Sequence, residues 1–518
     1  SRYSLGKLMD ELGIAFPTRH RAVEDAKAAH ALFIALLERA GKLDPKIIQE
    51  ITRLGDKSDW PLKYAFQDLL RDKARTAFAP GTIGAQLAAK GAAQDETLGL
   101  LFSRDPKEQP LKPKASNDPL DVDALAYLLG PDGAFAQHFP GYEYRPQQIE
   151  MLRAVAGAFN DDATLLVEAG TGTGKSVAYL VPALYWAAQN NQRVVISTNT
   201  INLQDQLYLK DLPDLRKILP FEFKAALLKG RSNYVCRRRL DSLRKSDKLT
   251  AEEVRVLAKV LAWLPSTTTG DSAELTLMGA ENQVWSRLSS DQDHCSAEHC
   301  ALRQENKCFF YRAREKAESA HVIIVNHALL LSDVATENRV LPEYKYLVID
   351  EAHHLEARAT EALSFEASRS TLELMVRGLA NERGGLIGNL AGSLRNSDVP
   401  PPIKRSVQDI FDDVAQDIDR ALRGAYEFFN ALDGFLGQQE QQPGESDSGY
   451  DRQVRLTPAR RAQPDWSRIE IEWEDFGARL AKVRDGMEKM YSAWSELDEY
   501  EVPSQPDLEQ ELAFAMRR

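Results

Sequence analysis

Apolar residues form two different patterns along the chain, and the first lies between about residues 140 and 358. Short, nearly continuous apolar runs occur at 164–167, 193–197, 322–325 and 346–349. Strands that are buried on both faces of a parallel sheet carry such runs, whereas half-exposed strands alternate apolar and polar residues. Because helical segments separate some of the runs, this region is predicted to be an α/β domain with a parallel sheet.

The second pattern, after residue 358, places apolar residues at steps of three and four. This spacing puts the side chains on one face of a helix. Two such stripes predict two long helices packed along one another. Residues 437–450 between them are rich in Gln, Gly and Ser and are predicted to form a loop. The stripes consist of Val407, Ile410, Val414, Ile418, Ala421, Ala425, Phe428 and Leu432, and of Phe476, Leu480, Val483, Met487, Met490 and Trp494.

The chain before residue 139 is predicted to contain helices and a linker. Residues 1–40 are expected to form a short helix, a turn that begins at Gly13, and a longer helix over 22–37. One more helix is predicted at 62–78. The rest of 41–130 is loosely patterned and rich in Ala, Gly, Pro and Lys, which indicates a linker.

Composition narrows the class of protein. The chain has 518 residues, 43% hydrophobic and 27% charged, and a formal net charge of −12. These values are typical of a soluble protein of roughly three or four domains, and they disfavour a protein that coats nucleic acid through overall positive charge. No apolar run reaches the ~18 residues that cross a bilayer, and no signal peptide precedes the first helix, so a cytoplasmic location is expected. Because the chain begins at Ser1 without a Met, we expect a fragment.

A glycine-rich segment follows the first apolar run and precedes a helical pattern. It reads Ala-Gly-Thr-Gly-Thr-Gly-Lys-Ser over 169–176, with Ala169 where the usual phosphate loop has Gly. Glycines let the backbone turn tightly and direct its N–H groups at phosphate oxygens, and the following helix directs its positive end at the same point. Lys175 is expected to reach the outer phosphates and Ser176 to hold Mg²⁺. The predicted nucleotide-binding residues are Gly170, Thr171, Gly172, Thr173, Gly174, Lys175 and Ser176.

Two adjacent carboxylates, Asp350 and Glu351, follow the last apolar run. Ligands of parallel sheets bind at the carboxyl ends of the strands, so both side chains are expected near the phosphate loop. We expect Asp350 to hold Mg²⁺ through its water shell and Glu351 to orient or deprotonate the attacking water. Together with Lys175, these are the predicted catalytic residues.

The four cysteines lie within one 73-residue stretch, which suggests a shared ligand. They are Cys236, Cys295, Cys300 and Cys308. Four thiolates hold either zinc or a 4Fe–4S cluster, and the spacing alone leaves both open. No Cys-x2-Cys unit occurs, which weighs against an ordinary zinc ribbon, but His294 and His299 keep a mixed zinc site possible.

Basic residues are concentrated around the first cysteine. Residues 224–248 contain nine Lys or Arg and two Asp, a local charge of +7. Such a run is often only a solvated face. With Tyr234, Phe309, Phe310 and Tyr311 in the same region, it also suggests a surface that guides a nucleic-acid strand.

Several of these segments resemble a known family. The Asp-Glu-Ala-His sequence of 350–353 and the loop of 169–176 resemble those of superfamily 2 helicases. Residues 144–148, Tyr-Arg-Pro-Gln-Gln, resemble an adenine-recognition segment in which Gln147, with Arg145 beside it, would contact the base. Residues 197–200 and 203–207 resemble a motif that touches the single-strand backbone. Residues 229–236 and 325–330 resemble those of DinG-type (XPD-like) iron–sulfur DNA helicases.

The resemblance implies a fold and an activity. The fold would be a RecA-like α/β domain (139–228 and 313–358), with an iron–sulfur insert (229–312) and a largely helical arch domain (359–518). The activity would be ATP-dependent helicase action with 5′→3′ polarity on single-stranded DNA, or on DNA with a single-stranded tail. The cofactors would be ATP, Mg²⁺ and a 4Fe–4S cluster held by the four cysteines. Residues 41–138 would be a helical segment and linker.

The first 40 residues resemble the end of a DnaQ-like 3′→5′ exonuclease domain. In that family a His and an Asp at this spacing activate water and bind metal, which assigns these roles to His20 and Asp25. The acidic pair that such a nuclease also needs would lie upstream, so we expect an incomplete site.

Three functions are therefore carried forward. The first is a helicase, and we expect this chain to lack the second RecA-like domain. On that expectation the chain by itself would bind ATP weakly, turn it over slowly if at all, and not unwind DNA. The second is an exonuclease regulated by ATP, and the third is a DNA-binding protein switched by ATP without motor output.

Overall fold

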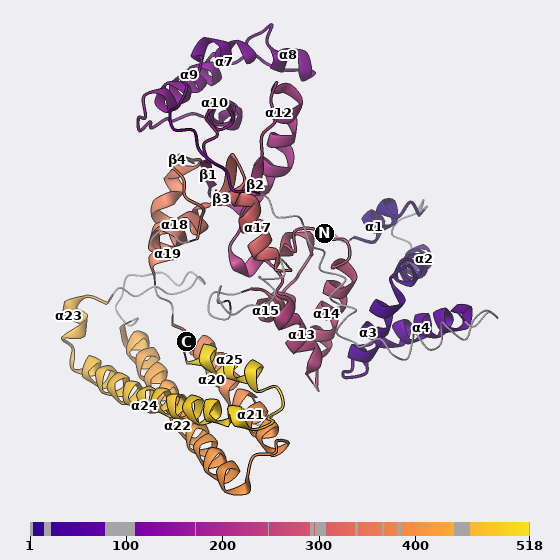
Figure 1. Cartoon of the computed structure of the whole chain (residues 1–518), viewed down its shortest axis with the longest axis vertical. Coiled ribbons are helices and arrows are strands. Elements are labelled where there is room, and N and C mark those ends of the chain that lie inside the picture. The colour runs from indigo at the N-terminus through magenta and orange to yellow at the C-terminus, as the bar shows by residue number, and fades with distance from the viewer. Residues whose placement is uncertain are drawn as a thin grey trace. The chain divides into compact units, whose positions relative to one another are not determined.

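The computed structural model describes residues 4–14, 22–77, 109–170, 172–246, 248–290, 295, 307–336, 340–364, 367–380, 385–439, 456–500 and 501–516. The chain divides into two compact units, Ser1–Leu363 and Ser364–Arg518, which are described separately (Figure 1).

The first unit is built on a parallel sheet. Within the described residues the sheet has four strands in the order β2-β3-β1-β4. β1 (Val194–Thr198) pairs in parallel with both β3 (Val322–Asn326) and β4 (Tyr346–Ile349), and β2 (Ala225–Leu227) pairs with β3. The predicted parallel sheet is confirmed, and three of its four predicted strands are found. β2 was not predicted, because three residues of moderate hydrophobicity give little signal.

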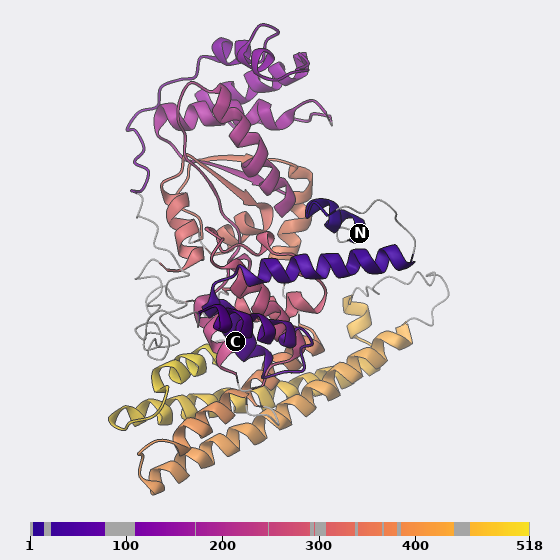
Figure 2. The ribbon, with the colours of Figure 1, turned by 90° about the vertical axis from the view of Figure 1, so that its right-hand side faces the viewer.

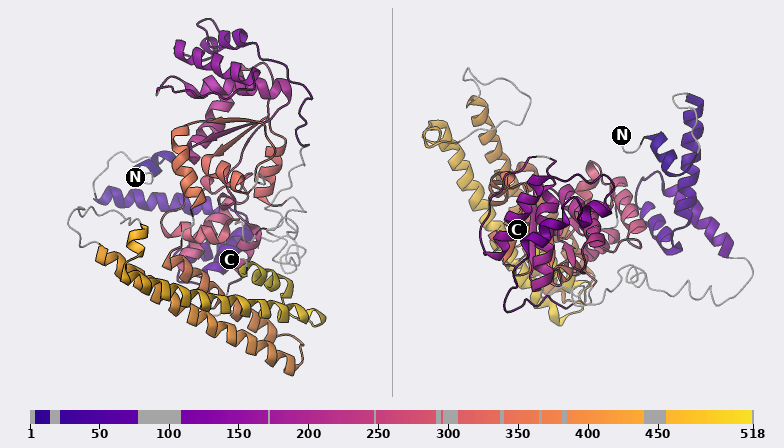
Figure 3. Two further views of the ribbon diagram at one scale, coloured as in Figure 1. Left: turned by 90° about the vertical axis from the view of Figure 1, so that its left-hand side faces the viewer. Right: turned by 90° about the horizontal axis from the view of Figure 1, so that it is seen from above.

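Helices cover both faces of this sheet, as the two side views show (Figures 2 and 3). On one face, Val194 and Ile196 of β1 pack with α9 and α10 in one buried cluster. On the other face, Val195 and Ile323 pack with residues of α17 and α18. Successive strand residues point to opposite faces, so strands covered on both sides must be apolar at every position.

The helices of the first unit are α1 (Leu5–Glu11), α2 (Ala22–Gly41), α3 (Pro45–Gly55), α4 (Lys63–Ala77), α7 (Val122–Leu128), α8 (Ala134–His138), α9 (Pro146–Asn160), α10 (Lys175–Asn190), α11 (Ile201–Gln206), η1 (Leu207–Asp211, a π-helix), α12 (Leu212–Ile218), η2 (Arg231–Asn233), α13 (Arg237–Lys245), α14 (Ala251–Trp263), η3 (Ser272–Glu274), α15 (Ala280–Leu288), α17 (Phe309–Glu318), α18 (His327–Ala335), η4 (Ala352–His354) and α19 (Leu355–Leu363). The predicted short helix, turn and long helix at the start of the chain are confirmed as α1, a turn at Gly13 with φ +67°, and α2.

Residues 164–167, predicted to be a buried strand, lie outside the sheet. Leu165, Leu166 and Val167 are exposed, Leu166 to 92% of its surface. The prediction was wrong because an apolar run indicates that a strand could be buried but not which neighbour would accept it. The chain enters this segment through Asp162, whose φ is +52° and whose carboxylate is 2.9 Å from Lys345 Nζ, just before β4.

The cysteine-bearing insert, residues 229–312, shares its core with a segment that precedes the parallel sheet in the sequence. Ile47, Ile51 and Leu54 of α3, with Trp60, join the buried cluster formed by α13, α14 and α15. α3 begins at an Asp44 side chain that accepts the N–H of Lys46 at 2.8 Å, with Pro45 in the first turn. Part of the region predicted as a helical segment and linker is therefore a structural layer of the insert.

The second unit is helical in the described residues. It contains α20 (Arg369–Leu379), α21 (Gly385–Arg395), α22 (Pro401–Gln439), α23 (Pro458–Arg461), α24 (Pro464–Ser495), η5 (Glu496–Glu499) and α25 (Gln505–Ala515). α22 and α24 lie along one another (Figure 1), and residues of the two predicted stripes meet in one buried core. In that core the rings of Phe411 and Trp494 are tilted relative to one another, with their centroids 6.2 Å apart. The predicted pair of long helices is confirmed. The helices approach closely at Gly486, where a Cβ would lie 2.9 Å from Val414 Cγ2.

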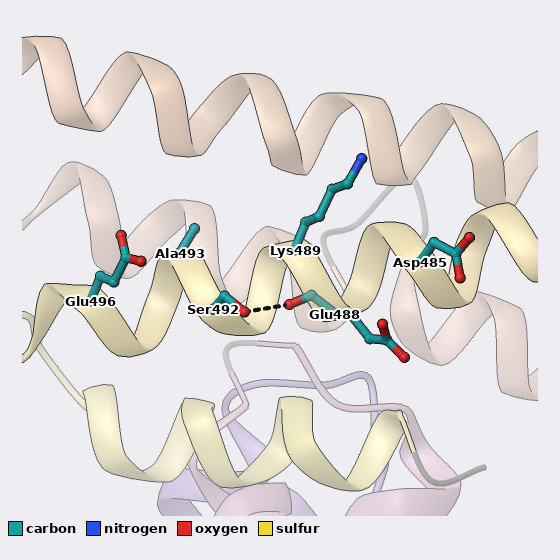
Figure 4. Close-up of a pocket in the computed structure, with 6 residues that line it drawn as sticks. All are labelled: Asp485, Glu488, Lys489, Ser492, Ala493 and Glu496. Carbon is teal, nitrogen blue, oxygen red and sulfur yellow. Dashed lines mark hydrogen bonds between the residues drawn. The ribbon is translucent and has the colours of Figure 1, made fainter.

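A surface hollow is lined by side chains of the end of α24 and by Glu496, the first residue of η5 (Figure 4). The six residues include three carboxylates and one lysine, and among them the Ser492 hydroxyl donates to the Glu488 carbonyl at 3.1 Å. These are the features of a solvated polar face. Among the described residues, no helix is both long enough and apolar enough to cross a membrane.

Candidate ATP site

The phosphate loop lies at the start of α10, as the sequence predicted. Gly172 and Gly174 have φ values of +81° and +79°, in the left-handed region where glycine is favoured. Lys175 and Ser176 form the first turn of α10, whose unpaired N–H groups face the loop. Thr173 Oγ1 donates to the Gly170 carbonyl at 2.9 Å and closes the turn. Thr171 lies outside the described residues.

Two side chains from the start of α9 hold this loop. Arg145 Nη1 donates to the Gly172 carbonyl at 2.6 Å, and Gln148 Nε2 donates to the Gly174 carbonyl at 2.9 Å. Gln148 is only 6% exposed, and a Cβ on Gly174 would lie 2.1 Å from its Nε2. Gln147, the predicted adenine contact, is exposed. Sequence reasoning missed Gln148, because the motif alone does not fix which of two adjacent glutamines faces the loop.

The two predicted carboxylates stand at the end of β4, beside the loop. Lys175 Nζ lies 3.2 Å from Glu351 Oε1, and the Asp350 N–H donates to the Ser197 carbonyl of β1 at 2.8 Å. Adjacent strand residues normally point to opposite faces. Glu351 instead has φ +54° and ψ +40°, which turns the backbone sharply after Asp350. Such left-handed non-glycine residues are concentrated at functional sites.

Asp350 has a buried hydrogen-bond partner that the sequence did not reveal. Tyr179, one turn after Lys175 on α10, donates its hydroxyl to Asp350 Oδ2 at 3.2 Å. Burial, together with the negative charge of Glu351, raises the pKa of Asp350 above its usual value. Burial and the neighbouring Asp350 likewise raise the pKa of Tyr179, so its hydroxyl stays protonated. Ser176 offers a hydroxyl oxygen and Asp350 a carboxylate oxygen, both of them ligand types that suit Mg²⁺.

Replacing Tyr179 with phenylalanine is expected to weaken Mg²⁺ binding while leaving metal-free nucleotide binding unchanged. The substitution removes only the hydroxyl, which bonds to Asp350 and also to Ser176. Each such contact contributes about 1 kcal/mol, or roughly a fivefold effect. The Mg²⁺ concentration needed for half-maximal fluorescence change of a labelled ATP analogue measures this. Tyr185→Phe, farther along α10, is the matched control. An unchanged Mg²⁺ requirement in Tyr179→Phe would show that the hydroxyl does not orient Asp350.

Three of the four cysteines are described, and each belongs to the insert. Cys236 precedes α13 and Cys308 precedes α17, so both lie at helix N-termini, which favour thiolates. Burial raises the pKa of Cys236, with a further contribution from the nearby Cys295. The soft donors suit a metal centre. The described residues, however, contain no group of three or more potential metal ligands, and Cys300, His294 and His299 lie outside them.

The basic run around Cys236 is largely engaged within the first unit. Arg244 is buried, with Glu50 of α3 and Asp241 each 2.8 Å from its guanidinium. Arg239 donates to the Ser289 carbonyl at 2.8 Å, and Arg231 lies 4.5 Å from the centre of the Phe310 ring.

The aromatic residues suggested as a strand-guiding surface are also structural. The side chains of Tyr234, Phe309, Phe310 and Tyr311 are buried in the core of the insert. The suggestion that they help to guide a strand is therefore corrected, because buried rings offer no face on which a base could stack.

The exonuclease residues are described only in part. Asp25 lies in the first turn of α2, whereas His20 is outside the described residues.

Two family models match overlapping parts of the chain. Residues 200–372 match DEAD_2, and residues 141–252 match the res subunit of type III restriction enzymes. Together they cover the loop, both carboxylates and the whole sheet.

Curated relatives are similar to the chain over different lengths. The chain is 28% identical over 499 residues, 96% of its length, to a protein of Bacillus subtilis named 3′-5′ exonuclease DinG, and it covers 50% of that protein. It is 38% identical over 236 residues (45% of this chain, 36% of the relative) to the ATP-dependent DNA helicase YoaA of Haemophilus influenzae. It is 41% identical over 256 residues (46% and 38%) to the ATP-dependent helicase DinG of Mycobacterium tuberculosis. The chain thus spans half or less of the length of these relatives, two of which are named as ATP-dependent helicases.

Proposed function

We propose that this chain acts as part of an ATP-dependent DNA helicase. The observation that carries the proposal is the convergence of Lys175 with Glu351 at 3.2 Å, beside an Asp350 held by Tyr179. One cation, one carboxylate suited to Mg²⁺ and one suited to water are the groups that phosphoryl transfer needs. The family models and the names of the relatives support the same activity.

The hydrolysis step follows from these positions. The outer phosphates of ATP compete with Glu351 for the Lys175 ammonium. Asp350 and Ser176 would hold the Mg²⁺, which would supply positive charge to the phosphates. Glu351, released from Lys175, accepts a proton from a water molecule. At the same time the oxygen of that water bonds to the terminal phosphorus. The bond from that phosphorus to the bridging oxygen breaks, which yields ADP and phosphate.

DNA is proposed to bind beyond the end of β1. Residues 197–200 include the last two residues of that strand and the two that follow it. Asn199 Oδ1 accepts a hydrogen bond from Arg358 Nε at 3.1 Å. A cation and an amide at one point suit a phosphate backbone. We further propose that the strand is single, and that movement is 5′→3′, by the resemblance described above.

The activity is tested by measuring ATP hydrolysis with and without single-stranded DNA, and strand separation on duplexes with a 5′ or a 3′ tail. Hydrolysis stimulated by DNA is expected, and separation of the 5′-tailed duplex is expected of a protein that also contains the second RecA-like domain. Digestion of labelled strands that ATP only modulates would instead favour the exonuclease, a reading that the name of the Bacillus subtilis relative keeps open. ATP-dependent DNA binding without separation would favour the switch.

The four cysteines are proposed to hold a 4Fe–4S cluster, whose role would be to brace the insert. Replacing Cys236 with serine is expected to abolish brown colour and lower iron from about four atoms per chain. Metal and acid-labile sulfide analysis after anaerobic purification measures this, and Ser242→Ala on the exposed face of α13 is the control. Zinc in place of iron in the unaltered chain would reject the cluster.

A further inference from the structure

Lys229 is a buried charge at the junction between the sheet and the cysteine-bearing insert. It follows β2 and is 2% exposed. Its Nζ lies 2.9 Å from Asp205 Oδ1 on α11 and 2.7 Å from Asp271 Oδ2, just before η3 in the insert. One ammonium thus joins a carboxylate of the motor to a carboxylate of the insert.

Because of these charges, the effect of a substitution at the junction depends on whether the lysine or one of the two carboxylates is replaced. Two carboxylates share one buried ammonium, and without it they would repel one another in a poorly solvated place. Removing either carboxylate, by contrast, leaves Lys229 paired with the other. The link between the two parts can therefore be cut from either side without stranding a buried lysine.

On the motor side, the contacts lead back to the ATP site. Thr200 caps α11 by accepting the Leu203 N–H, and Gln204 Nε2 donates to the Leu228 carbonyl at 3.3 Å. Ser197, near the end of β1, makes two polar contacts. Its carbonyl accepts the Asp350 N–H at 2.8 Å, and its hydroxyl lies 2.8 Å from His327 Nδ1.

On the insert side, the contacts lead to the first cysteine. Asp271 forms an antiparallel bridge with Tyr234, whose hydroxyl accepts the Lys229 N–H at 3.1 Å. The N–H of Val235 donates to Gly270 and that of Cys236 to Leu288, at 3.0 and 2.8 Å. These bonds connect the segment that holds Asp271 to Cys236.

A helical segment whose conformation could change lies next to this junction. η1, the π-helix over Leu207–Asp211, joins α11 to α12 without a break. Such wide turns are rare and occur mainly at functional sites. Conversion of the wide turn to α-helix would shift α11 along and around its axis, and Asp205 with it.

We propose that Lys229 is a positioning residue that transmits the nucleotide state of the motor from α11 to the cysteine-bearing insert. This inference rests on the proposed function, because it needs ATP to bind at Lys175. It goes beyond that function by naming the contact through which the insert responds.

The test is hydrogen exchange of this chain with and without a non-hydrolysable ATP analogue and Mg²⁺. In the unaltered chain, the analogue is expected to change exchange both in α11 and in the insert peptides around Tyr234 and Asp271. In Asp271→Asn, the change in α11 is expected to remain while the change in the insert is lost. A purely structural role would not separate the two responses. Asp214→Asn, in an exposed pair with Lys217, is the control.

Two results would contradict the proposed role of Lys229. If the insert of Asp271→Asn still responds to the analogue, or if α11 of the unaltered chain responds while the insert does not, Lys229 does not transmit the nucleotide state. Should Asp271→Asn melt early, Asp205→Asn cuts the same link and leaves the Lys229–Asp271 pair inside the insert, with loss of the insert response again expected. Failure of the unaltered chain to bind the analogue would overturn the proposed function itself.

Discussion

Replacing Lys175 with alanine is expected to lower the rate of ATP hydrolysis on the order of 100-fold or more and to weaken ATP binding. The ammonium is the cation nearest to Glu351 in the site, at 3.2 Å, and it would be exchanged from that carboxylate to the phosphates. Without it, the negative charge of the transferring phosphate and that of Glu351 face each other uncompensated. Steady-state hydrolysis and the affinity for a fluorescent ATP analogue measure both effects.

The control for this change is Lys217→Ala. Lys217 is an exposed lysine of α12 paired with Asp214 at 2.7 Å, so its loss removes the same charge from the chain without touching the loop. It is expected to hydrolyse ATP at the unaltered rate. Equal rates for Lys175→Ala and the unaltered chain would mean that hydrolysis takes place elsewhere.

The parts of the fold that the sequence predicted are those in which a local pattern determines the structure. Apolar runs at every position gave β1, β3 and β4, and stripes at steps of three and four gave α22 and α24. The loop of Gly172 and Gly174 was predictable because its backbone requires glycine. In each case, neighbours in sequence supply the physical reason.

The parts that were missed depend on partners far along the chain. Residues 164–167 have the pattern of a buried strand. Whether they form one depends on whether the edge strand of the sheet pairs with them. Tyr179 became part of the site only when the fold brought Asp350 to it, 171 residues away. The basic run of residues 224–248 was interpreted as a possible surface. Arg244 within it is instead buried and pairs with Glu50 of α3. The spacing of residues along the sequence does not predict these long-range contacts.

Replacing Glu351 with glutamine is expected to slow hydrolysis about 100- to 10,000-fold, the usual contribution of a positioned general base, while ATP binding is kept or tightened. Glutamine has the size of glutamate but cannot accept the proton from water. It also removes the negative charge that competes with phosphate for Lys175, which lies 3.2 Å away. The two site variants should therefore agree in hydrolysis and differ in binding, since only Lys175→Ala loses affinity.

This opposite effect on binding is what separates a catalytic carboxylate from one that only maintains the fold. Glu356→Gln, on the exposed start of α19, removes the same charge five residues away and should change neither quantity. Titration with the fluorescent ATP analogue and single-turnover hydrolysis measure the two quantities independently. If Glu351→Gln loses ATP affinity together with its hydrolysis, then Glu351 supports the phosphate loop rather than the water, and the base must be sought among the other groups at the end of β4.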